Sequence, residues 1–486
     1  MQPVEYDNEL TQLTHEQSGS LEDFHRSYEA AAESVKAELG ESHPLLIDGE
    51  RVETGDEFTV EAPGDRGVTV GTFAAGAESE VEDAVAAAND AFPEWEAKSP
   101  EERAEVFTTA ADIMRDRKFE LAATLSLENG KNRGEAMADV DEAIDFLDFY
   151  SREFTRSDGY QFDTGEPTPG QHTTNLLRPY GVFAVVSPFN FPMALLVGMS
   201  TGALLTGNTA VVKPASATPL VAQKYVDILE EAGIPDGVVN LVLGSGSEVG
   251  QPLVEHEDVK GVAFTGSRAV GTGIQETFME LGKRGPVIAE LGGKNPVIVS
   301  DEADMDDAVE GVMKGAFSFS GQKCSATSRV YVDESVIDEF TDRLVAETEE
   351  LTIGRPEDED TFVSPLIDDD ALDHYLTISE QAREDGTVLT GGQEADDADL
   401  PEGRYVEPTV VADIPHEHDL AREEHFVPFL TVHPISDLDE GIEKSNDSEY
   451  GLCAGLFSTD DDEIDRWFDE IESGMCYVNR SQSATT

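Results

Sequence analysis

The sequence is poor in cysteine, tryptophan and basic residues. Its 486 residues include 3 cysteines, 2 tryptophans and 32 Lys plus Arg. Cys324, Cys453 and Cys476 show no C-x-x-C spacing, which excludes a disulfide framework and a cysteine zinc site. The run 416–418, His-Glu-His, lacks the i, i+4 spacing of a zinc-binding helix. We therefore predict no metal site, and we interpret this run as part of an acidic loop.

The shortage of basic residues also limits the partners. Against 102 Asp plus Glu, the formal net charge is −70. Binding to nucleic acid or to anionic lipid depends largely on Lys and Arg that neutralise phosphate, so both partners are excluded. Carboxylates at this density repel one another unless salt screens them, and the Debye length falls to about 3 Å at 1 M salt. We infer a salt-rich cytoplasm.

Long apolar runs are absent as well. The longest one, 191–205, contains Pro and Gly and is shorter than the ~20 residues of a membrane span. The N-terminus has no charged-then-apolar signal pattern, so we expect a soluble, cytoplasmic protein. The hydrophobic fraction of 39% lies in periodic segments throughout the chain, which indicates a packed protein of two or three domains.

The first part of the chain divides into an arm and a helical region. Residues 1–40 are polar and acidic, with a helical run from Leu21 to Leu39, and form a predicted N-terminal arm. From Glu78 to about Tyr150 the pattern is helical, and residues 99–102, Ser-Pro-Glu-Glu, predict a capping box. Residues 157–179 are rich in Gly and Pro, with a strand predicted at 172–178. They form a predicted bridging arm for oligomerisation.

From Gly181 onward, β-rich runs alternate with helical ones. The runs are 183–186, 210–213, 238–242 and 262–264. This alternation predicts right-handed βαβ units and a doubly wound parallel sheet, hence an α/β fold. We assign 41–156 and 180–289 to this first domain, 290–478 to a second α/β domain, and 479–486 to a C-terminal segment.

Three of the predicted strands end in residues suited to a dinucleotide. Lys213 ends one strand, the glycine-rich stretch 244–250 with Gly246 follows the next, and Gly266 and Ser267 follow another. Glycine lets the backbone approach a phosphate at a helix N-terminus. One such turn also serves as a plain tight connection, but three in one sheet predict a dinucleotide site.

One thiol and two polar side chains predict acyl chemistry. Cys324 lies in the loop 318–326, and a thiol with a pKa near 8.5 needs a basic neighbour or oriented N–H groups to be nucleophilic. Lys323 and the glycines after Glu290 are suited to that role. Asn190 offers an oxyanion donor, and Glu290 offers a base for hydrolysis. The alternatives are a small buried hydrophobe for Cys324 and a turn-former for Asn190.

Six motifs together resemble the aldehyde dehydrogenase superfamily in order and spacing over residues 44–480. The motifs are Pro-Phe-Asn-Phe-Pro 188–192, Lys-Pro-Ala 213–215, Phe-Thr-Gly-Ser 264–267, Glu-Leu-Gly-Gly 290–293, Gly-Gln-Lys-Cys 321–324 and Glu-Glu-His-Phe 423–426. Residues 317–326, 141–146 and the N-terminal arm look like the 1-pyrroline-5-carboxylate dehydrogenase branch. That branch oxidises L-glutamate γ-semialdehyde to glutamate.

The resemblance implies roles for individual residues. Cys324 is implied as the nucleophile, Glu290 as the deacylation base and Asn190 as the oxyanion donor. Lys213 is implied at the adenosine ribose, Ser267 at the pyrophosphate, Glu424 at the nicotinamide ribose and Phe426 against the nicotinamide. The other implied NAD(P)-binding residues are Ser187, Pro188, Ser216, Gly246 and Gly266. The implied substrate residues are Ser325 for the α-carboxylate, Phe191 for the aliphatic chain and Glu142 for the ammonium.

Some positions depart from the family pattern. Ser216 stands where many NAD-specific relatives have Glu, which leaves room for NADP beside NAD. His425 and Val427 replace the usual Ile and Gly around Phe426. The sequence stops at Thr486, where relatives continue into a substrate-carboxylate loop and an oligomerisation strand, so we expect a homo-oligomer with weakened pairing. A dehydrogenase for succinate or 2-oxoglutarate semialdehyde, and an inactive scaffold or partner subunit, are the alternatives.

Overall fold

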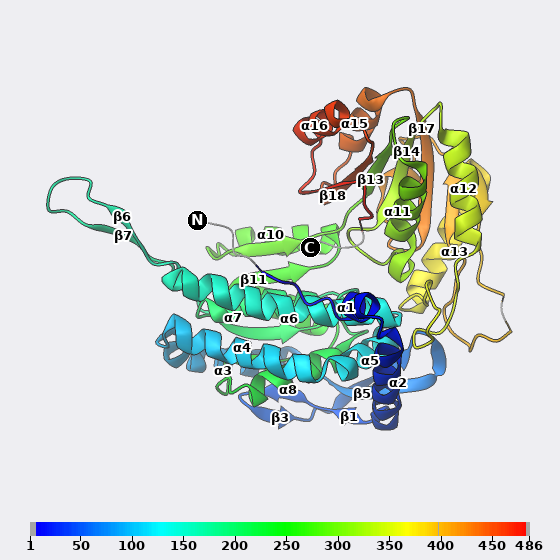
Figure 1. Ribbon diagram of the computed structural model, residues 1–486. Coiled ribbons are helices and arrows are strands. Elements are labelled where there is room, and N and C mark those ends of the chain that lie inside the picture. Colours follow the sequence, from blue (N-terminus) through cyan, green and yellow to red (C-terminus); the bar gives the residue numbers. More distant parts are fainter. Residues whose placement is uncertain (1–5, 397, 483–486) are drawn as a thin grey trace. The chain divides into compact units, whose positions relative to one another are not determined.

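The computed structural model describes residues 6–396 and 398–482, which fall into two compact units. Within the described residues, unit 1 comprises 6–62, 67–129 and 133–290, and unit 2 comprises 63–66, 130–132, 291–396 and 398–482. Figure 1 colours both along the chain. Glu290 belongs to unit 1 and does not begin the second domain as the motif suggested, because its strand pairs with a strand of the unit 1 sheet.

Unit 1 contains these elements. The helices are α1 (Thr11–Ser18), α2 (Leu21–Glu38), α3 (Glu78–Glu96), α4 (Pro100–Asp116), α5 (Lys118–Asn129), α6 (Arg133–Arg156), α7 (Ala194–Leu205), α8 (Pro219–Glu231), α9 (Gln251–Glu255) and α10 (Arg268–Glu280), with the short turns η1 (Asp158–Tyr160) and η2 (Gly246–Gly250). The strands are β1 (Ser42–His43), β2 (Leu45–Ile47), β3 (Glu50–Val52), β4 (Asp56–Ala62), β5 (Asp65–Ala75), β6 (Phe162–Gly165), β7 (Thr173–Asn175), β8 (Val182–Val186), β9 (Thr209–Lys213), β10 (Val239–Leu241), β11 (Val259–Thr265) and β12 (Val287–Glu290).

The main sheet of unit 1 has the strand order β12-β11-β8-β9-β10-β2-β3. Strands β8 to β12 are parallel, and β2 and β3 add an antiparallel edge. The predicted parallel sheet is therefore confirmed. The chain runs outward from β8 through β9 to β10 and then returns to β11 on the other side of β8. Ligands of open α/β sheets bind at such a reversal, beyond the carboxyl ends of the strands.

Local sequence signals account for several of these elements. The fully buried strand β9 is a continuous apolar run before its lysine, which is typical of a parallel strand covered on both faces. The predicted capping box at the start of α4 is confirmed. The Ser99 hydroxyl accepts from the Glu102 N–H at 3.2 Å, and the Glu102 carboxylate accepts from the Ser99 N–H at 2.8 Å.

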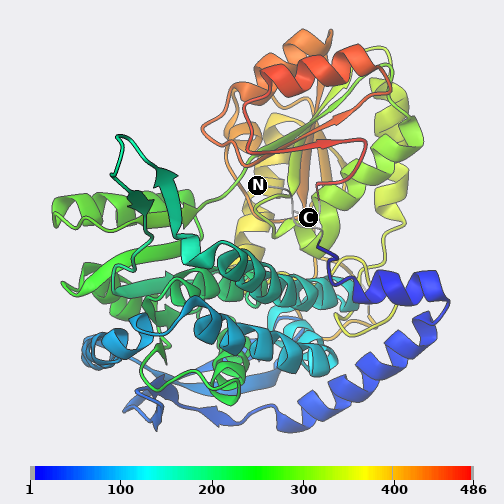
Figure 2. The same cartoon turned by 60° about the vertical axis from the view of Figure 1, so that its left-hand side comes forward.

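The N-terminal arm is folded against unit 1, where α1 and α2 (dark blue in Figure 2) run along one side. Helix α2 packs on α5 through the buried Phe24 and Tyr28. Near α1, the Asp141 carboxylate on α6 accepts from both the N–H and the hydroxyl of Thr11 at 2.7 Å. The helix predicted from Leu21 to Leu39 is confirmed, ending one residue earlier.

Residues 157–179 form a two-stranded hairpin that extends away from the end of α6 (Figure 1). The strand predicted at 172–178 is shorter than expected. It covers Thr173–Asn175 and pairs antiparallel with β6. Both strands are exposed, and large apolar side chains flank them, with Phe162 52% and Leu177 50% exposed.

Unit 2 contains the following elements. The strands are β13 (Asn295–Val299), β14 (Thr327–Asp333), β15 (Thr387–Thr390), β16 (Thr409–Ala412), β17 (Phe429–Ile435), β18 (Cys453–Phe457) and β19 (Met475–Val478). The helices are α11 (Met305–Phe317), α12 (Ile337–Glu349), α13 (Asp369–Asp385), α14 (Asp419–Arg422), α15 (Leu438–Asn446) and α16 (Asp461–Glu470), with the short turn η3 (Ser318–Gly321).

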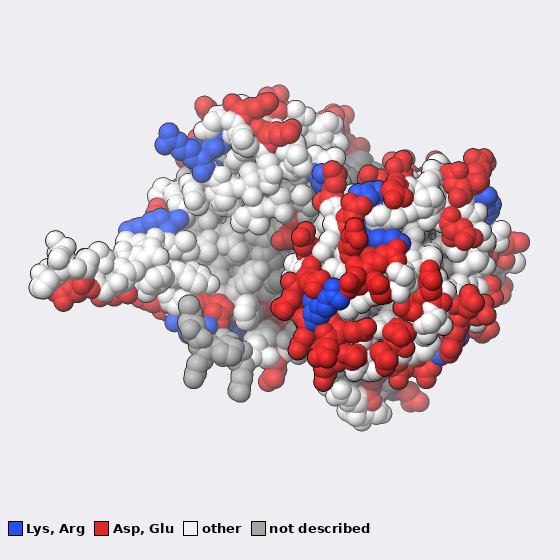
Figure 3. Space-filling view, turned by 90° about the horizontal axis from the view of Figure 1, so that it is seen from above, with Lys and Arg blue, Asp and Glu red and all other residues white. Residues whose placement is uncertain are grey.

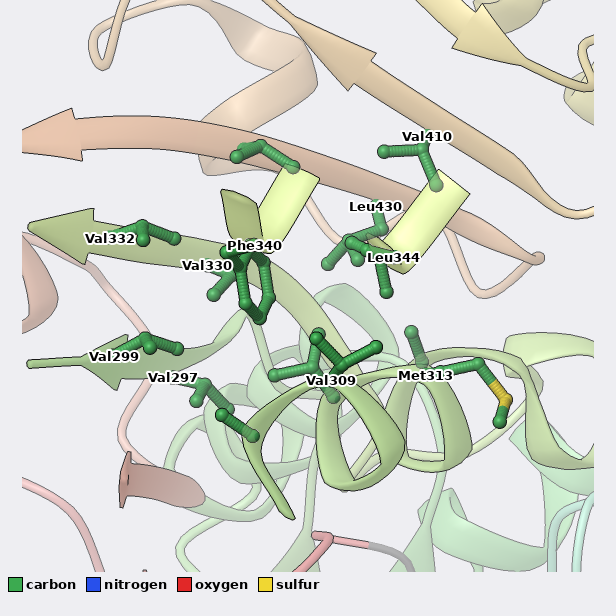
Figure 4. Close-up of a cluster of buried hydrophobic side chains, with 14 of the residues drawn as sticks. Val297, Val299, Val309, Met313, Val330, Val332, Phe340, Leu344, Val410 and Leu430 are labelled. Carbon is green, nitrogen blue, oxygen red and sulfur yellow. The ribbon is translucent and has the colours of Figure 1, made fainter. Parts of the chain in front are cut away.

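The sheet of unit 2 has the order β15-β16-β17-β14-β13-β18-β19 and is parallel except for β15. Alternate side chains of β13 enter two separate cores. Val297 and Val299 pack with Val309 of α11 and Phe340 of α12 (Figure 4), whereas Ile298 packs in a cluster with α15 and α16. Helices therefore cover both faces of a largely parallel sheet, which confirms the second α/β fold predicted for this part of the chain.

Carboxylates cover much of the surface. Figure 3 shows Asp and Glu crowded over one part of the face in view, with few Lys and Arg among them, whereas other residues cover much of the rest of that face. Within residues 6–396 and 398–482, no helix is both long and apolar enough to cross a membrane.

Candidate active site

The polar ends of the central strands meet at one edge of the unit 1 sheet. Val186 pairs with Lys213, and Thr265 pairs with Glu290. The Ser187 N–H donates to the Lys213 carbonyl at 3.2 Å, and the Gly266 N–H donates to the Glu290 carbonyl at 3.1 Å. Four of the predicted residues are thus neighbours at the carboxyl edge beside the chain reversal.

Lys213 is buried at the end of β9, with 6% of its surface exposed. Its Nζ donates to the Pro214 carbonyl at 3.0 Å, and burial lowers its pKa to about 8. A buried amine with unused donor capacity is suited to bind hydroxyl groups of a ligand. The exposed Ser216 donates its hydroxyl to the Gly244 carbonyl at 2.9 Å, which joins the loops after β9 and β10.

The glycine-rich turns lie at helix starts, as the sequence predicts. Gly246 is exposed and begins η2, where the Ser245 hydroxyl accepts from the Glu248 N–H at 3.1 Å. Ser267 is the N-cap residue of α10, and its hydroxyl accepts from the Val270 N–H at 3.4 Å. Gly266 precedes it directly. These N-termini offer N–H groups to an anion.

Asn190 lies in the turn between β8 and α7 and is 3% exposed. A residue that the sequence analysis missed holds this turn. The Asn129 side-chain Nδ2, at the end of α5, donates to the Phe189 carbonyl at 2.7 Å. The Ser187 hydroxyl is buried and has no hydrogen-bond partner within the described residues. Pro188 and Phe191 in the same turn are half-buried.

Two acidic residues of unit 1 share a neighbourhood. Glu290 is exposed at the end of β12, and Glu142 is half-buried on α6. Burial raises the pKa of Tyr150, and the charges of Glu142 and Glu290 raise it further. Glu142, the candidate for the substrate ammonium, and Glu290, the candidate base, therefore both raise the pKa of Tyr150. No sequence motif pointed to Tyr150.

In unit 2, Cys324 follows a loop with an unusual backbone. Phe319, Ser320 and Gly321 all have positive φ, at 48°, 52° and 68°. Positive φ is uncommon for residues other than glycine and costs about 1–3 kcal/mol for each, so the surroundings must hold it. The Gln322 side chain supplies part of this support, because its Oε1 accepts from the Ile367 N–H at 2.9 Å.

The three cysteines differ in environment. Cys324 is half-buried, whereas Cys453 is buried and burial raises its pKa to about 12. Burial also raises the pKa of Cys476. Ser325, the predicted contact for the substrate carboxylate, is 6% exposed. A thiol with a raised pKa is a poor nucleophile, so Cys453 and Cys476 are unsuited to covalent catalysis.

Glu424 packs directly against the Glu-Leu-Gly-Gly turn. Its Oε1 accepts from the Gly293 N–H at 2.8 Å, and a Cβ on Gly292 would clash with its Oε2. Burial raises the pKa of Glu424 to about 7, opposed by the Gly293 bond and by the charge of Lys294. Burial in turn lowers the pKa of Lys294, whose Nζ donates to the Leu420 carbonyl at 3.0 Å.

The residues next to Glu424 form a fixed turn. Phe426 has a φ of 59° and is half-buried. The His425 ring stands edge-on to Phe429 at 5.7 Å, and its Nε2 lies 3.3 Å from the Leu420 carbonyl. His425 therefore occupies a packed position beside Phe426, where the usual residue of the family pattern is Ile.

Comparison with known proteins identifies the family of the chain. Residues 51–486 match the aldehyde dehydrogenase family. The chain belongs to this family. It is 40% identical over 462 residues to 1-pyrroline-5-carboxylate dehydrogenase from Geobacillus thermodenitrificans, with 94% of this chain and 88% of that one covered.

Solved structures give the same picture. The crystal structure of 1-pyrroline-5-carboxylate dehydrogenase from Thermus with bound NAD has a TM-score of 0.93 and 36% identity, covering 99% of this chain and 92% of that one. Proline utilization A from Bdellovibrio bacteriovorus has a TM-score of 0.94 and 35% identity. All of this chain is covered but only 50% of that protein, so the chain spans half the length of that relative.

The residues of unit 1 fit the dinucleotide that this family uses. An unpartnered buried hydroxyl at Ser187, a buried amine at Lys213 and exposed N–H groups near Gly246 and Ser267 lie at the carboxyl edge or at helix starts, within the described part of the chain. Ribose and pyrophosphate groups bind to donors of these kinds.

Proposed function

We propose that the protein oxidises L-glutamate γ-semialdehyde, the open form of 1-pyrroline-5-carboxylate, to glutamate with NAD, as a step of proline catabolism. The observation that carries the proposal is the position of Cys324. Its thiol is half-buried directly after a loop of positive φ that Gln322 and Asn295 hold by hydrogen bonds. The 40% identity to a 1-pyrroline-5-carboxylate dehydrogenase supports the substrate, and the Thermus relative with bound NAD supports the cofactor.

The proposed reaction uses three groups. The Cys324 thiolate attacks the aldehyde carbon and forms a thiohemiacetal, whose oxyanion accepts hydrogen bonds from the Asn190 amide and the Cys324 N–H. Bound NAD supplies the acceptor for the hydride that leaves this carbon. Glu290 then removes a proton from a water molecule, which attacks the thioester and releases the thiol. Aldehyde, NAD and water thus yield carboxylate, NADH and two protons.

The cofactor residues are assigned by the resemblance and by the chemistry of their positions. Lys213 and Ser216 would hold the adenosine ribose, with Ser187 and Pro188 in the loop beside it. Gly246, Gly266 and Ser267 would bind the pyrophosphate. Glu424 would accept from the nicotinamide ribose, and Phe426 would pack against the nicotinamide.

The substrate residues are matched to a zwitterionic semialdehyde. Glu142 faces the ammonium group, Ser325 hydrogen-bonds the α-carboxylate and Phe191 packs on the methylene chain. Succinate semialdehyde has a carboxylate but no ammonium group. Glu142 therefore distinguishes the two substrates, because its negative charge attracts the ammonium group of glutamate γ-semialdehyde and has no such partner on succinate semialdehyde.

The catalytic test compares Cys324→Ala with Cys476→Ser. Cys324→Ala should abolish NADH formation and leave NAD affinity within about twofold, because the thiol carries the chemistry and is not among the residues proposed to bind the nucleotide. Cys476→Ser should retain turnover. Turnover of the Cys324→Ala variant above a few per cent of wild type would sink the assignment of Cys324, whereas absence of turnover in the wild-type protein would favour the inactive-scaffold alternative.

The substrate test uses Glu142→Gln on two aldehydes. Losing a charge-assisted contact to the ammonium group, worth about 1.5–3 kcal/mol, should lower kcat/KM for glutamate γ-semialdehyde by about 10- to 150-fold. The value for succinate semialdehyde should stay within about twofold. Equal losses on both aldehydes would show that Glu142 does not recognise the ammonium group.

We further propose a homo-oligomer in a salt-rich cytoplasm. The exposed β6–β7 hairpin, with Phe162 and Leu177 each about half exposed, offers an unpaired sheet edge and apolar area for a second copy. Substituting both residues by Ser should lower the mass measured by light scattering after size exclusion. An unchanged mass would show that the hairpin does not take part in subunit contacts.

A further inference from the structure

Asn295 is a buried side chain that joins the nucleophile loop to the sheet of unit 2. It is 2% exposed and begins β13, the strand that lies between β14 and β18. The Cys324 loop ends where β14 begins, and Cys453 begins β18. Asn295 therefore lies between the loop that carries the nucleophile and the neighbouring strand.

The Asn295 amide uses both of its N–H donors and its oxygen on backbone groups. Its Nδ2 donates to the Cys324 carbonyl at 2.7 Å and to the Ala326 carbonyl at 2.9 Å. Its Oδ1 accepts from the Cys453 N–H at 3.1 Å. Only this orientation of the amide satisfies all three partners, because the reverse would place an oxygen against two carbonyls.

The bond to the Cys324 carbonyl fixes the peptide plane that follows the nucleophile. Gly293 also packs closely against this peptide, because a Cβ on Gly293 would clash with the Cys324 carbonyl oxygen. Upstream, Phe319 and Ser320 hold positive φ values that need support from their surroundings. Gln322 braces that end of the loop, and Asn295 braces the end at Cys324.

We propose that Asn295 is a positioning residue for the Cys324 nucleophile, and that its two donated hydrogen bonds set the direction and reactivity of the thiol. The proposal rests on the proposed function, in which Cys324 attacks the aldehyde. Asn295 touches neither substrate nor cofactor. It acts through the backbone of Cys324, where a displacement of about 1 Å is enough to cost a reaction roughly 100-fold.

The test measures alkylation of Cys324 by iodoacetamide, followed by peptide mass spectrometry, in wild type, Asn295→Asp and Asn295→Leu. No substrate or cofactor is needed. The aspartate side chain preserves the acceptor for Cys453 but turns an oxygen toward two carbonyls, and the leucine side chain removes every bond. At pH 8 both variants should label Cys324 about tenfold more slowly, with kcat lowered and KM for NAD within about twofold.

A pH series separates positioning from general damage. When the carboxyl introduced by Asn295→Asp is protonated, it regains a donor toward one of the two carbonyls. The ratio of wild-type to Asn295→Asp labelling rates should therefore shrink toward about threefold or less as pH falls to 6, whereas the ratio for Asn295→Leu stays constant. The titratable groups around this amide are Cys324 and Cys453, which it bonds through their backbones, and Tyr477 and Cys476 beside Cys453. All four are present in every protein compared.

Asn240→Asp is the matched control. Asn240 is 0% exposed in unit 1, accepts from the Asp48 N–H at 2.9 Å and donates to the Gly237 carbonyl at 2.8 Å. It should lower the melting temperature yet leave Cys324 labelling within about twofold of wild type. If Asn295→Asp does not fold, Asn295→Ser, which cannot reach both carbonyls, takes its place at pH 8.

Labelling of the Asn295 variants at the wild-type rate, or slowed only as much as in Asn240→Asp, overturns the proposal. A slowdown of fivefold or more that is specific to Asn295 supports it. Failure of the proposed function is a separate result. Retained turnover in Cys324→Ala would show that the thiol is not needed for the reaction, and it would leave the comparison of labelling rates unchanged.

Discussion

The affinity for NAD should rise with pH through neutrality because of Glu424. Burial raises the pKa of this carboxyl to about 7, against the opposing effects of the Gly293 N–H and the Lys294 charge. The ionised carboxylate offers two acceptor oxygens, whereas the protonated carboxyl carries an O–H donor on one of them and is a weaker acceptor for the proposed ribose hydroxyls. Protonation below pH 7 therefore removes acceptor capacity from the site proposed to hold that ribose.

The size of the effect follows from the pKa. A carboxyl with a pKa of about 7 is roughly one-tenth ionised at pH 6 and roughly nine-tenths ionised at pH 8. If the cofactor binds only the ionised form, the apparent affinity is reduced by the competent fraction, so the Kd should fall about tenfold between these pH values. That ratio corresponds to about 1.4 kcal/mol of binding free energy.

Titration of NADH fluorescence at pH 6, 7 and 8 measures this change. Glu424→Gln should bind with an affinity that varies less than about twofold over the range, and the neighbour variant Glu423→Gln should behave like wild type. Lys213, whose pKa burial lowers to about 8, titrates in the opposite sense in all three proteins, so their difference isolates Glu424. A wild-type Kd that is flat, or a tenfold change that persists in Glu424→Gln, refutes the reasoning.

Three further predictions concern hydrolysis, stability and salt. Glu290→Gln should slow thioester hydrolysis more than hydride transfer, so stopped-flow absorbance should show a larger NADH burst; loss of the burst would place Glu290 earlier in the reaction. Burial raises the pKa of Glu128 from 4.5 to about 8, so this carboxyl destabilises the fold increasingly as pH rises through that window. The Tm of Glu128→Gln minus the Tm of wild type should therefore increase between pH 6 and 9, and a constant difference contradicts this. Tm should also rise from 0.1 M to ~2 M KCl, and a flat or falling Tm excludes salt adaptation.

The strands and the helix starts could be predicted because their signals are local. The strand β8 is one continuous apolar run, and the helix at Pro100 carries its own cap in Ser99 and Glu102. The alternation of such runs was enough to predict parallel sheets, which the strand pairing confirms. The family motifs then marked the strand ends, since most of them lie within a few residues of a strand terminus.

The supports of the site could not be predicted because they join distant parts of the chain. Asn129 reaches a carbonyl 60 residues away, and Asn295 reaches one 29 residues away. An asparagine that caps a loop leaves no periodic pattern, and the bonded partner is a carbonyl, which every residue possesses. The positive φ of Phe319 and Ser320 was equally hidden, because neither residue type favours that conformation.

Cys324 and Glu424, the proposed nucleophile and ribose acceptor, lie against tightly packed backbone in unit 2, which restricts substitution at the neighbouring glycines. A Cβ on Gly292 would clash with the Glu424 carboxylate, and one on Gly321 would clash with the Val427 carbonyl. Two glycine positions therefore leave no room for a methyl group. The backbone at Gly292 lies against the Glu424 side chain, and the backbone at Gly321 lies against the backbone at Val427. A substitution at either glycine must displace the acceptor segment, the thiol loop or both. Residues on that segment, such as His425 and Val427, can differ from the usual pattern because their side chains are not what holds the three pieces together.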